Sequence, residues 1–201
     1  MISTIILAAG ESKRMGRPKM LLPWDKSTVL QTVITTFQAA GIQDIIVVTG
    51  SAHNQVDLLI GQTVQTVYNE NYLKGEMLSS IQLGIRFKMR ESQAAFIALG
   101  DQPQIQVRTI QHILREYKQT HSSLIVPSYN MRRGHPWLVA RELWDDLLKT
   151  EPPETAREFL YQHSNDIHYI TMDTPTVLQD LDTPEDYLKS QSGSLPQNLK
   201  K

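Results

Sequence analysis

The 201-residue chain contains no cysteine, which excludes disulfide bonds, thiolate metal sites and a cysteine nucleophile. It also lacks an excess of charge of either sign, because 20 basic and 21 acidic side chains leave a net charge of −1. Without a broad basic field, nucleic acid is not expected as a partner. No apolar run approaches the ~20 residues that a membrane-spanning helix needs, so no membrane partner is expected either.

The opening segment, MISTIILAAG, is apolar, but no basic residue precedes its apolar run, which is short and ends in charges. We therefore expect a buried first strand rather than a secretory signal, and a cytoplasmic location. The length of the chain suits one α/β domain, which we expect at residues 1–189. The remaining residues, 190–201, are rich in Ser, Gln and Lys, and this composition predicts a disordered tail.

Short apolar runs alternate with segments of helical periodicity along the first two thirds of the chain. The runs are nearly continuous and rich in β-branched residues, as is typical of parallel strands covered on both faces. They lie at residues 2–7, 45–49, 63–68, 94–99 and 123–126. Helical spacing is found at residues 27–41, 77–86 and 107–117. The alternation predicts a doubly wound, mostly parallel α/β sheet.

The last third of the chain is less regular. We expect a short strand at residues 137–139 with a helix after it, then a helix at residues 155–163 and a strand at residues 166–172. A final helix is predicted to begin after Thr183, because this N-cap residue is followed by a proline and by acidic side chains.

A stretch rich in small and basic residues, LAAGESKRMGRPKMLLPW, follows the first predicted strand at residues 7–24. Ligands of open α/β sheets bind at the carboxyl ends of strands, where this stretch is expected to lie. Its small residues let the backbone approach an oxygen-rich ligand, while Arg14 and Lys19 can hold phosphate oxygens. The spacing fits neither the G-x-G-x-x-G fingerprint nor the Walker A loop. A solvated basic loop is the alternative, but the position at a strand end favours phosphate binding.

The same stretch resembles the signature L-A-(A/G)-G-x-S-x-R-M-G-x-x-K of nucleotidyltransferases with the nucleotide-diphospho-sugar transferase fold, a three-layer, Rossmann-like α/β fold. Within them, further stretches resemble the MobA-like family and its molybdenum cofactor cytidylyltransferase (MocA-like) group: YNENYLKGEMLSSIQLGI, LGDQP, RRGHP and DLDTPED. Tyr72 stands where this group has a tryptophan. The resemblance extends from Ile2 to about Lys189, and the shared order of the stretches makes chance agreement a poor explanation.

The resemblance implies a nucleotide site on the loop after the first strand and on the segment near residue 75. The residues that it implies for nucleotide binding are Leu7, Ala8, Ala9, Gly10, Arg14, Lys19, Gly75, Ser79 and Ser80. Of these, Arg14 and Lys19 are also implied to be catalytic, because they would hold the triphosphate. For Gly75 and the two serines, the residues alone fit the polar start of a helix nearly as well.

Asp101 directly follows a predicted strand, so its carboxylate is expected at the carboxyl edge of the sheet. Triphosphate chemistry needs a divalent cation, and Mg²⁺ prefers one or two carboxylates together with phosphate oxygens and water. The resemblance implies that Asp101 is a catalytic metal ligand, with Asp182 or Asp180 as the second carboxylate. The expected cofactor is Mg²⁺, with Mn²⁺ as the alternative. Outside these motifs, Asp101 would fit a turn and Asp182 a helix cap.

The RRGHP stretch is implied to face the acceptor of the transferred group. The implied residues are Arg132, Arg133, Gly134, His135 and Pro136. Either arginine suits a pterin phosphate. Zinc is not expected at His135, because no second histidine or cysteine stands at zinc-ligand spacing from it.

The resemblance implies that CTP and molybdopterin are the substrates, that the terminal phosphate of molybdopterin attacks the α-phosphorus, and that pyrophosphate leaves. That phosphate is mostly dianionic at pH 7, so positioning and charge neutralisation suffice. The triplet AAG favours CTP, since the guanylyl branch usually has AGG. The alternative substrates are GTP or another nucleotide, and another small phosphate acceptor. The alternative role is that of a non-catalytic escort, which carries molybdopterin to a molybdenum hydroxylase. Such a hydroxylase is also the protein partner that the resemblance implies if the chain is an enzyme. A redox role has no dinucleotide fingerprint to support it.

Overall fold

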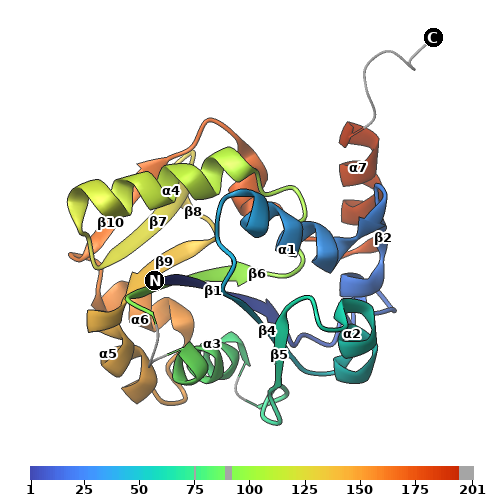
Figure 1. The fold of residues 1–201 in the computed structure, drawn as a ribbon, viewed down its shortest axis with the longest axis horizontal. Helices are drawn as coiled ribbons and strands as arrows, with labels where there is room; N and C mark the ends of the chain where they lie inside the picture. Colours follow the sequence, from blue (N-terminus) through green and yellow to red (C-terminus); the bar gives the residue numbers. More distant parts are fainter. Residues whose placement is uncertain (75, 89–91, 195–201) are drawn as a thin grey trace.

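The computed structural model describes residues 1–74, 76–88 and 92–194 (Figure 1). Its strands are β1 (Ile2–Ala8), β2 (Pro23–Trp24), β3 (Ser27–Thr28), β4 (Ile45–Thr49), β5 (Gln65–Tyr68), β6 (Ala94–Leu99), β7 (Leu124–Tyr129), β8 (Arg132–Arg133), β9 (Trp137–Ala140) and β10 (Ile167–Thr171). An eight-stranded sheet has the order β10-β7-β9-β6-β1-β4-β5, with β8 paired to β7, and β2 and β3 form a separate hairpin.

Most strands of the large sheet run in one direction. β1 pairs in parallel with β4 and β6, and β4 pairs in parallel with β5. The exceptions are β8 and β9, since β9 is antiparallel to both β6 and β7, and β8 is antiparallel to β7. The parallel direction resumes between β7 and β10. The predicted mostly parallel sheet is therefore confirmed, and the carboxyl ends of β1, β4, β5 and β6 meet at one edge.

Helices cover both faces of the sheet, as Figure 1 shows. The helices are α1 (Val29–Ala39), α2 (His53–Ile60), α3 (Glu76–Lys88), α4 (Val107–Thr120), α5 (Trp144–Lys149), α6 (Ala156–Gln162) and α7 (Pro184–Ser194), with the 3-10 turns η1 (Lys19–Leu21), η2 (Arg141–Leu143) and η3 (Pro175–Leu178). Side chains of α1, α2 and α4 pack on one face, and those of α3, α5 and α6 pack on the other. This is the predicted three-layer arrangement.

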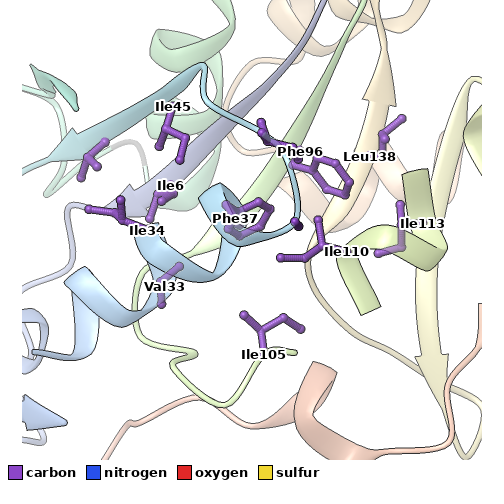
Figure 2. Close-up of a cluster of buried hydrophobic side chains, with 14 of the residues drawn as sticks. Ile6, Val33, Ile34, Phe37, Ile45, Phe96, Ile105, Ile110, Ile113 and Leu138 are labelled. Carbon is purple, nitrogen blue, oxygen red and sulfur yellow. The ribbon is translucent and has the colours of Figure 1, made fainter. Parts of the chain in front are cut away.

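The strand β1 shows why its sequence is apolar at nearly every position. Ile6 points into the cluster beneath α1 and α4, whereas its neighbour Ile5 points into the opposite cluster, and both are fully buried. Figure 2 shows the first cluster, in which Phe37 of α1 faces Phe96 of β6 edge-on with ring centroids 5.6 Å apart. Burial on both sides fixes the register of β1, and therefore the position of the loop that follows it.

The structure departs from the predicted elements in several places. Helix α2 was not predicted, because Val56 and Ile60 are its only buried residues and its apolar periodicity is weak. The strand expected at residues 63–68 is shorter and begins at Gln65. None of the helices in the described ranges combines the length and the apolar character needed to cross a bilayer.

The predicted tail begins too early. Residues 190–194 continue α7, because Gln191 donates hydrogen bonds to the carbonyl oxygen of Pro23 at 3.3 Å and to the hydroxyl of Tyr187 at 2.7 Å. These contacts hold the end of the helix against the β2–β3 hairpin. The rest of the predicted tail, residues 195–201, lies outside the described residues.

Candidate active site

The loops after β1 and β6 and the segment before α7 meet at the carboxyl edge of the sheet. The backbone N–H of Gly100 donates to the carbonyl oxygen of Leu7 at 2.9 Å, which joins the first two loops. The backbone N–H of Leu181 donates to the carbonyl oxygen of Asp101 at 3.1 Å, which joins the last two. Backbone contacts thus bring three of the predicted motifs to one place.

The loop after β1 is folded tightly on itself. Ser12 adopts a φ of +54°, and its carbonyl oxygen accepts hydrogen bonds from the N–H groups of Met15 and Gly16. The Ser12 hydroxyl accepts from the N–H of Lys19 at 3.1 Å. This turn is a local consequence of polar and glycine residues between two apolar segments. It carries Lys19 back beneath the strand end, toward the β6 loop.

A second set of contacts fastens the start of this loop to the end of β4. Ser51 donates its hydroxyl to the carbonyl oxygen of Gly10 at 2.9 Å and its N–H to that of Ala9 at 3.3 Å. Gly50 must be a glycine, because a Cβ there would lie 2.3 Å from the carbonyl oxygen of Ala9. Leu7, Ala8 and Ala9 are buried and Gly10 is exposed, so the backbone opens to solution at Gly10.

Arg14, Lys19, Asp101 and Asp182 form one ion-pair network. The Lys19 ammonium contacts Asp101 Oδ2 and lies 3.3 Å from Asp182 Oδ1. Arg14 donates to the other oxygen, Asp182 Oδ2, at 2.7 Å. Exposure increases along the network, since the side chains of Asp101 and Lys19 are 11% and 13% exposed, that of Asp182 is 31% exposed and that of Arg14 is 70% exposed. Arg14 is thus the cation of this network that is accessible from solution.

The charges around the ammonium of Lys19 favour its protonated form. Burial lowers the pKa of Lys19, but the charges of Asp101 and Asp182 outweigh this effect and raise that pKa above its ordinary value of 10.5. The pKa of Asp180 is also raised, first by the burial of its carboxyl group and then by the negative charges of Asp101 and Asp182. The carboxylate of Asp180 therefore lies within electrostatic reach of the pair.

The donor set suits a divalent cation that brings further ligands with it. In the part of the chain that the structure describes, no group of three histidine or acidic side chains could hold a metal alone. Asp101 and Asp182, however, direct carboxylate oxygens at one cationic group, the ammonium of Lys19. Two hard oxygen donors match Mg²⁺ or Mn²⁺ when phosphate oxygens and water complete the coordination.

Of the residues predicted after β5, the two serines are held by Asn69, which is not among the predicted site residues. The buried side chain of Asn69 donates from Nδ2 to the hydroxyls of Ser79 and Ser80, both at 2.9 Å, and accepts from the N–H of Asn71 at 3.0 Å. The signal in the sequence is an asparagine placed directly after a strand. Gly75 lies outside the described residues.

The RRGHP stretch exposes its two arginines, buries Gly134 and Pro136, and leaves His135 half-buried. Arg132 and Arg133 are exposed on β8, and Arg133 donates to the hydroxyl of Tyr169 at 2.8 Å. Gly134 packs against Val177, where a Cβ would lie 2.4 Å from the carbonyl oxygen. The arginines can therefore reach a ligand, whereas Gly134 serves close packing against η3.

His135 is held in a largely buried setting. Its N–H donates to the carbonyl oxygen of Val177 at 2.9 Å, and its ring stacks on Trp137 with centroids 4.5 Å apart. Its Nε2 is buried and hydrogen-bonds to no described residue. Burial lowers the pKa of the imidazole to about 4, so the ring is neutral at pH 7. Pro136, also buried, follows through a cis peptide bond.

One segment connects the RRGHP stretch with the ion-pair network. Val177 accepts the N–H of His135, and Leu181 in the same segment donates to Asp101. Among the described residues, no ion pair or side-chain hydrogen bond joins the RRGHP stretch to the network. The predicted nucleotide and acceptor residues therefore flank a shared element, residues 175–182.

Comparison with known proteins finds relatives over most of the chain. Residues 4–167 match the family described as MobA-like NTP transferase domain. The chain is 28% identical over 189 residues to the molybdenum cofactor cytidylyltransferase of Escherichia coli K12, covering 93% of this chain and 94% of that protein. It is also 28% identical over 193 residues to the nicotine blue oxidoreductase of Paenarthrobacter nicotinovorans (92% and 93%), and 30% identical over 139 residues to a probable molybdenum cofactor guanylyltransferase of Bacillus mycoides (68% and 66%).

Solved structures share the fold. The crystal structure of Rv0371c from Mycobacterium tuberculosis H37Rv superposes with a TM-score of 0.82 at 24% identity, covering 95% of this chain and 97% of that one. A manganese complex of the same mycobacterial protein gives a TM-score of 0.79 at 23% identity, covering 96% and 99%. Because the family match spans most of the sequence, the chain belongs to the MobA-like NTP transferase domain family and is an enzyme of the nucleotidyltransferase class.

Proposed function

We propose that this enzyme transfers CMP from CTP to the terminal phosphate of molybdopterin. The observation that carries the proposal is the network of Arg14, Lys19, Asp101 and Asp182 beside the small-residue loop after β1. It combines cations for a triphosphate with carboxylates for a metal ion. The name of the Escherichia coli relative, which matches almost the whole chain, supports the choice of nucleotide and acceptor.

In the proposed reaction, CTP lies over Leu7, Ala8, Ala9 and Gly10, where the backbone opens to solution at the strand end. An acceptor phosphate oxygen forms a bond to the α-phosphorus. The bond from that phosphorus to the oxygen bridging to the β-phosphate breaks, and its electron pair leaves with pyrophosphate. Because the attacking phosphate is already dianionic near pH 7, no side chain has to remove a proton.

The cationic side chains of the network supply position and charge. Arg14 is exposed and has a planar guanidinium that can hold two phosphate oxygens at once, whereas Lys19 supplies a point charge from a buried position. Both would stabilise the charge that develops on the departing pyrophosphate. The contact of Asn69 with Ser79 and Ser80 would set the wall of the base and ribose site.

Asp101 and Asp182 would hold a divalent cation, with Asp180 as a further carboxylate nearby. When bound, Mg²⁺ or Mn²⁺ would neutralise charge on the phosphate oxygens. The manganese complex of the mycobacterial structure supports a metal of this kind. On the acceptor side, Arg132 and Arg133 are exposed cations that could receive the pterin phosphate, next to the packed Gly134, His135 and Pro136.

The test is a pyrophosphate-release assay with each of the four nucleoside triphosphates, Mg²⁺ and molybdopterin, followed by identification of the nucleotide product. We expect release with CTP and a CMP adduct of molybdopterin. Release with CTP but only with a different phosphate acceptor would overturn the acceptor assignment. If none of the four nucleotides gives pyrophosphate release, the escort role is favoured. Binding of the protein to a molybdenum hydroxylase would then test that role.

A second candidate is the same transfer with GTP, which the similarity to the Bacillus protein favours. Preferred release of pyrophosphate from GTP in the same assay would select it. The Paenarthrobacter relative is named an oxidoreductase, so the redox alternative needs a separate assay. That assay measures the consumption of NADH or NADPH. The network of Arg14, Lys19 and Asp101 favours nucleotidyl transfer over that alternative.

A further inference from the structure

The ammonium of Lys19 lies at the place where the proposed function requires a metal ion. Its Nζ contacts Asp101 Oδ2 and is 3.3 Å from Asp182 Oδ1, so one amine bridges both carboxylates. These are the oxygens that a divalent cation would share with a triphosphate. The two acids are therefore neutralised in part by a side chain of the protein itself.

The bridging ammonium is held in a mostly buried position between the two carboxylates. The side chains of Lys19 and Asp101 are only 13% and 11% exposed, so their attraction is weakly screened by water. A free divalent cation that approached the pair would meet a fixed positive charge within a few ångströms, and this repulsion is large where screening is weak.

The backbone of Lys19 is anchored, so its release is a movement of the side chain alone. Its N–H is bound to the Ser12 hydroxyl at 3.1 Å, and its carbonyl oxygen accepts from Leu22 at 3.2 Å. Arg14 holds the outer oxygen of Asp182. A triphosphate beside the loop would offer the ammonium new anionic partners, so that it could rotate away from the carboxylates without any change in the loop.

We propose that Lys19 closes the carboxylate pair to free metal and opens it to a metal that arrives bound to a triphosphate. The substrate form of this site is then the metal–nucleotide complex, and nucleotide-free enzyme has a weak metal site. This inference rests on the proposed function, because it assumes that Asp101 and Asp182 serve the metal of nucleotidyl transfer. It adds a second role for Lys19, as the counter-ion that sets the order of binding.

Mn²⁺ binding to the nucleotide-free protein tests the proposal, with free Mn²⁺ measured by electron paramagnetic resonance. Lys19→Met removes the charge and keeps an unbranched side chain, and we expect Mn²⁺ affinity to rise about tenfold or more over wild type. Lys13→Met is the matched control, because Lys13 is 74% exposed and pairs with Glu11 instead. Its Mn²⁺ affinity should equal that of wild type.

Two further variants keep the result interpretable. Lys19→Met with Asp101→Asn should lose the gained affinity, which places the bound Mn²⁺ at the pair. Lys19→Gln retains a hydrogen-bond donor toward Asp101 and covers the case in which Lys19→Met is poorly folded. Mn²⁺ should also raise the melting temperature of either Lys19 variant more than that of wild type, because only the variants contain a carboxylate pair without its counter-ion.

Equal or weaker Mn²⁺ binding by both Lys19 variants, relative to wild type, would overturn the proposal. So would a gain that survives the Asp101→Asn change. Neither result depends on which nucleotide or acceptor is used, so pyrophosphate release by wild type still reports on the proposed function separately. Conversely, tighter Mn²⁺ binding by the variants together with no pyrophosphate release from any nucleotide would support the role of Lys19 and reject the transfer reaction.

Discussion

Leu181 donates its backbone N–H to the carbonyl oxygen of Asp101, across 3.1 Å and between segments that are far apart in the sequence. Leu181 is fully buried in a small cluster with Tyr187 of α7. The neighbouring Asp182 is therefore positioned by backbone pairing and apolar burial at Leu181 as well as by its own ion pairs. Such support holds the two carboxylates at a fixed separation, as a metal–triphosphate site requires.

Replacing Asp101 by asparagine should abolish most of the turnover. The change keeps the size of the side chain but removes the buried carboxylate, while Lys19 keeps Asp182 as its partner. We expect pyrophosphate release to fall by at least about 100-fold with folding intact. Asp182→Asn should have a similar effect and Asp180→Asn a smaller one. Near-wild-type release from Asp101→Asn would remove this residue from the mechanism.

Arg14 and Lys13 are adjacent exposed cations that should behave differently. Arg14 donates to Asp182 at 2.7 Å, whereas Lys13 pairs with Glu11 at 2.8 Å. Loss of a charge-assisted hydrogen bond predicts that Arg14→Ala lowers kcat/KM for the nucleotide by about tenfold to a hundredfold. Lys13→Ala should leave kcat/KM unchanged. Equal losses in both variants would indicate general electrostatic attraction instead.

Periodicity predicted the strands best where both faces are buried. The bounds of β4 and β6 are those expected from residues 45–49 and 94–99, since apolar character there has no competing explanation. Helix α2 was not predicted because its exposed side carries most of its residues. Apolar periodicity in a sequence reflects how much of an element is buried, so a short, half-exposed helix has only a weak pattern.

The predicted site residues could be named from motifs, but their pairing could not. The bridge from Lys19 to both Asp101 and Asp182 depends on how three loops fold against each other, which no local spacing records. The clamp from Asn69 to Ser79 and Ser80 was missed for the same reason. Such contacts follow from tertiary structure alone.

Changing Gly134 or Gly10 to alanine should affect stability differently. A Cβ at Gly134 would lie 2.4 Å from the carbonyl oxygen of Val177, so the backbone must shift. Gly134→Ala should therefore lower the free energy of unfolding by about 1–3 kcal/mol, measured with urea. A variant as stable as wild type would show that η3 can shift to accommodate the methyl group without loss of stability.

Gly10→Ala should leave stability nearly unchanged, because a Cβ there meets nothing within 4 Å and the backbone has no positive φ. We expect a change in the free energy of unfolding within about 0.5 kcal/mol of zero. If the backbone at Gly10 approaches the triphosphate, the added methyl group should still raise KM for the nucleotide. An unchanged KM, determined by pyrophosphate release, would place the phosphates elsewhere on the loop.

His135 should make the protein sensitive to mild acid. Burial lowers the pKa of its imidazole from 6.5 to about 4, so the folded state binds this proton less readily than the unfolded state does. The stabilisation is fully present above pH 6.5 and is lost as the pH falls toward 4, by up to about 3 kcal/mol. His135→Phe keeps a ring to stack on Trp137 but cannot titrate. Urea unfolding at about pH 7.5 and about pH 4.5 should show a smaller loss of stability on acidification in this variant than in wild type. Equal losses in the two proteins would show that burial does not lower the pKa of His135 in the folded state.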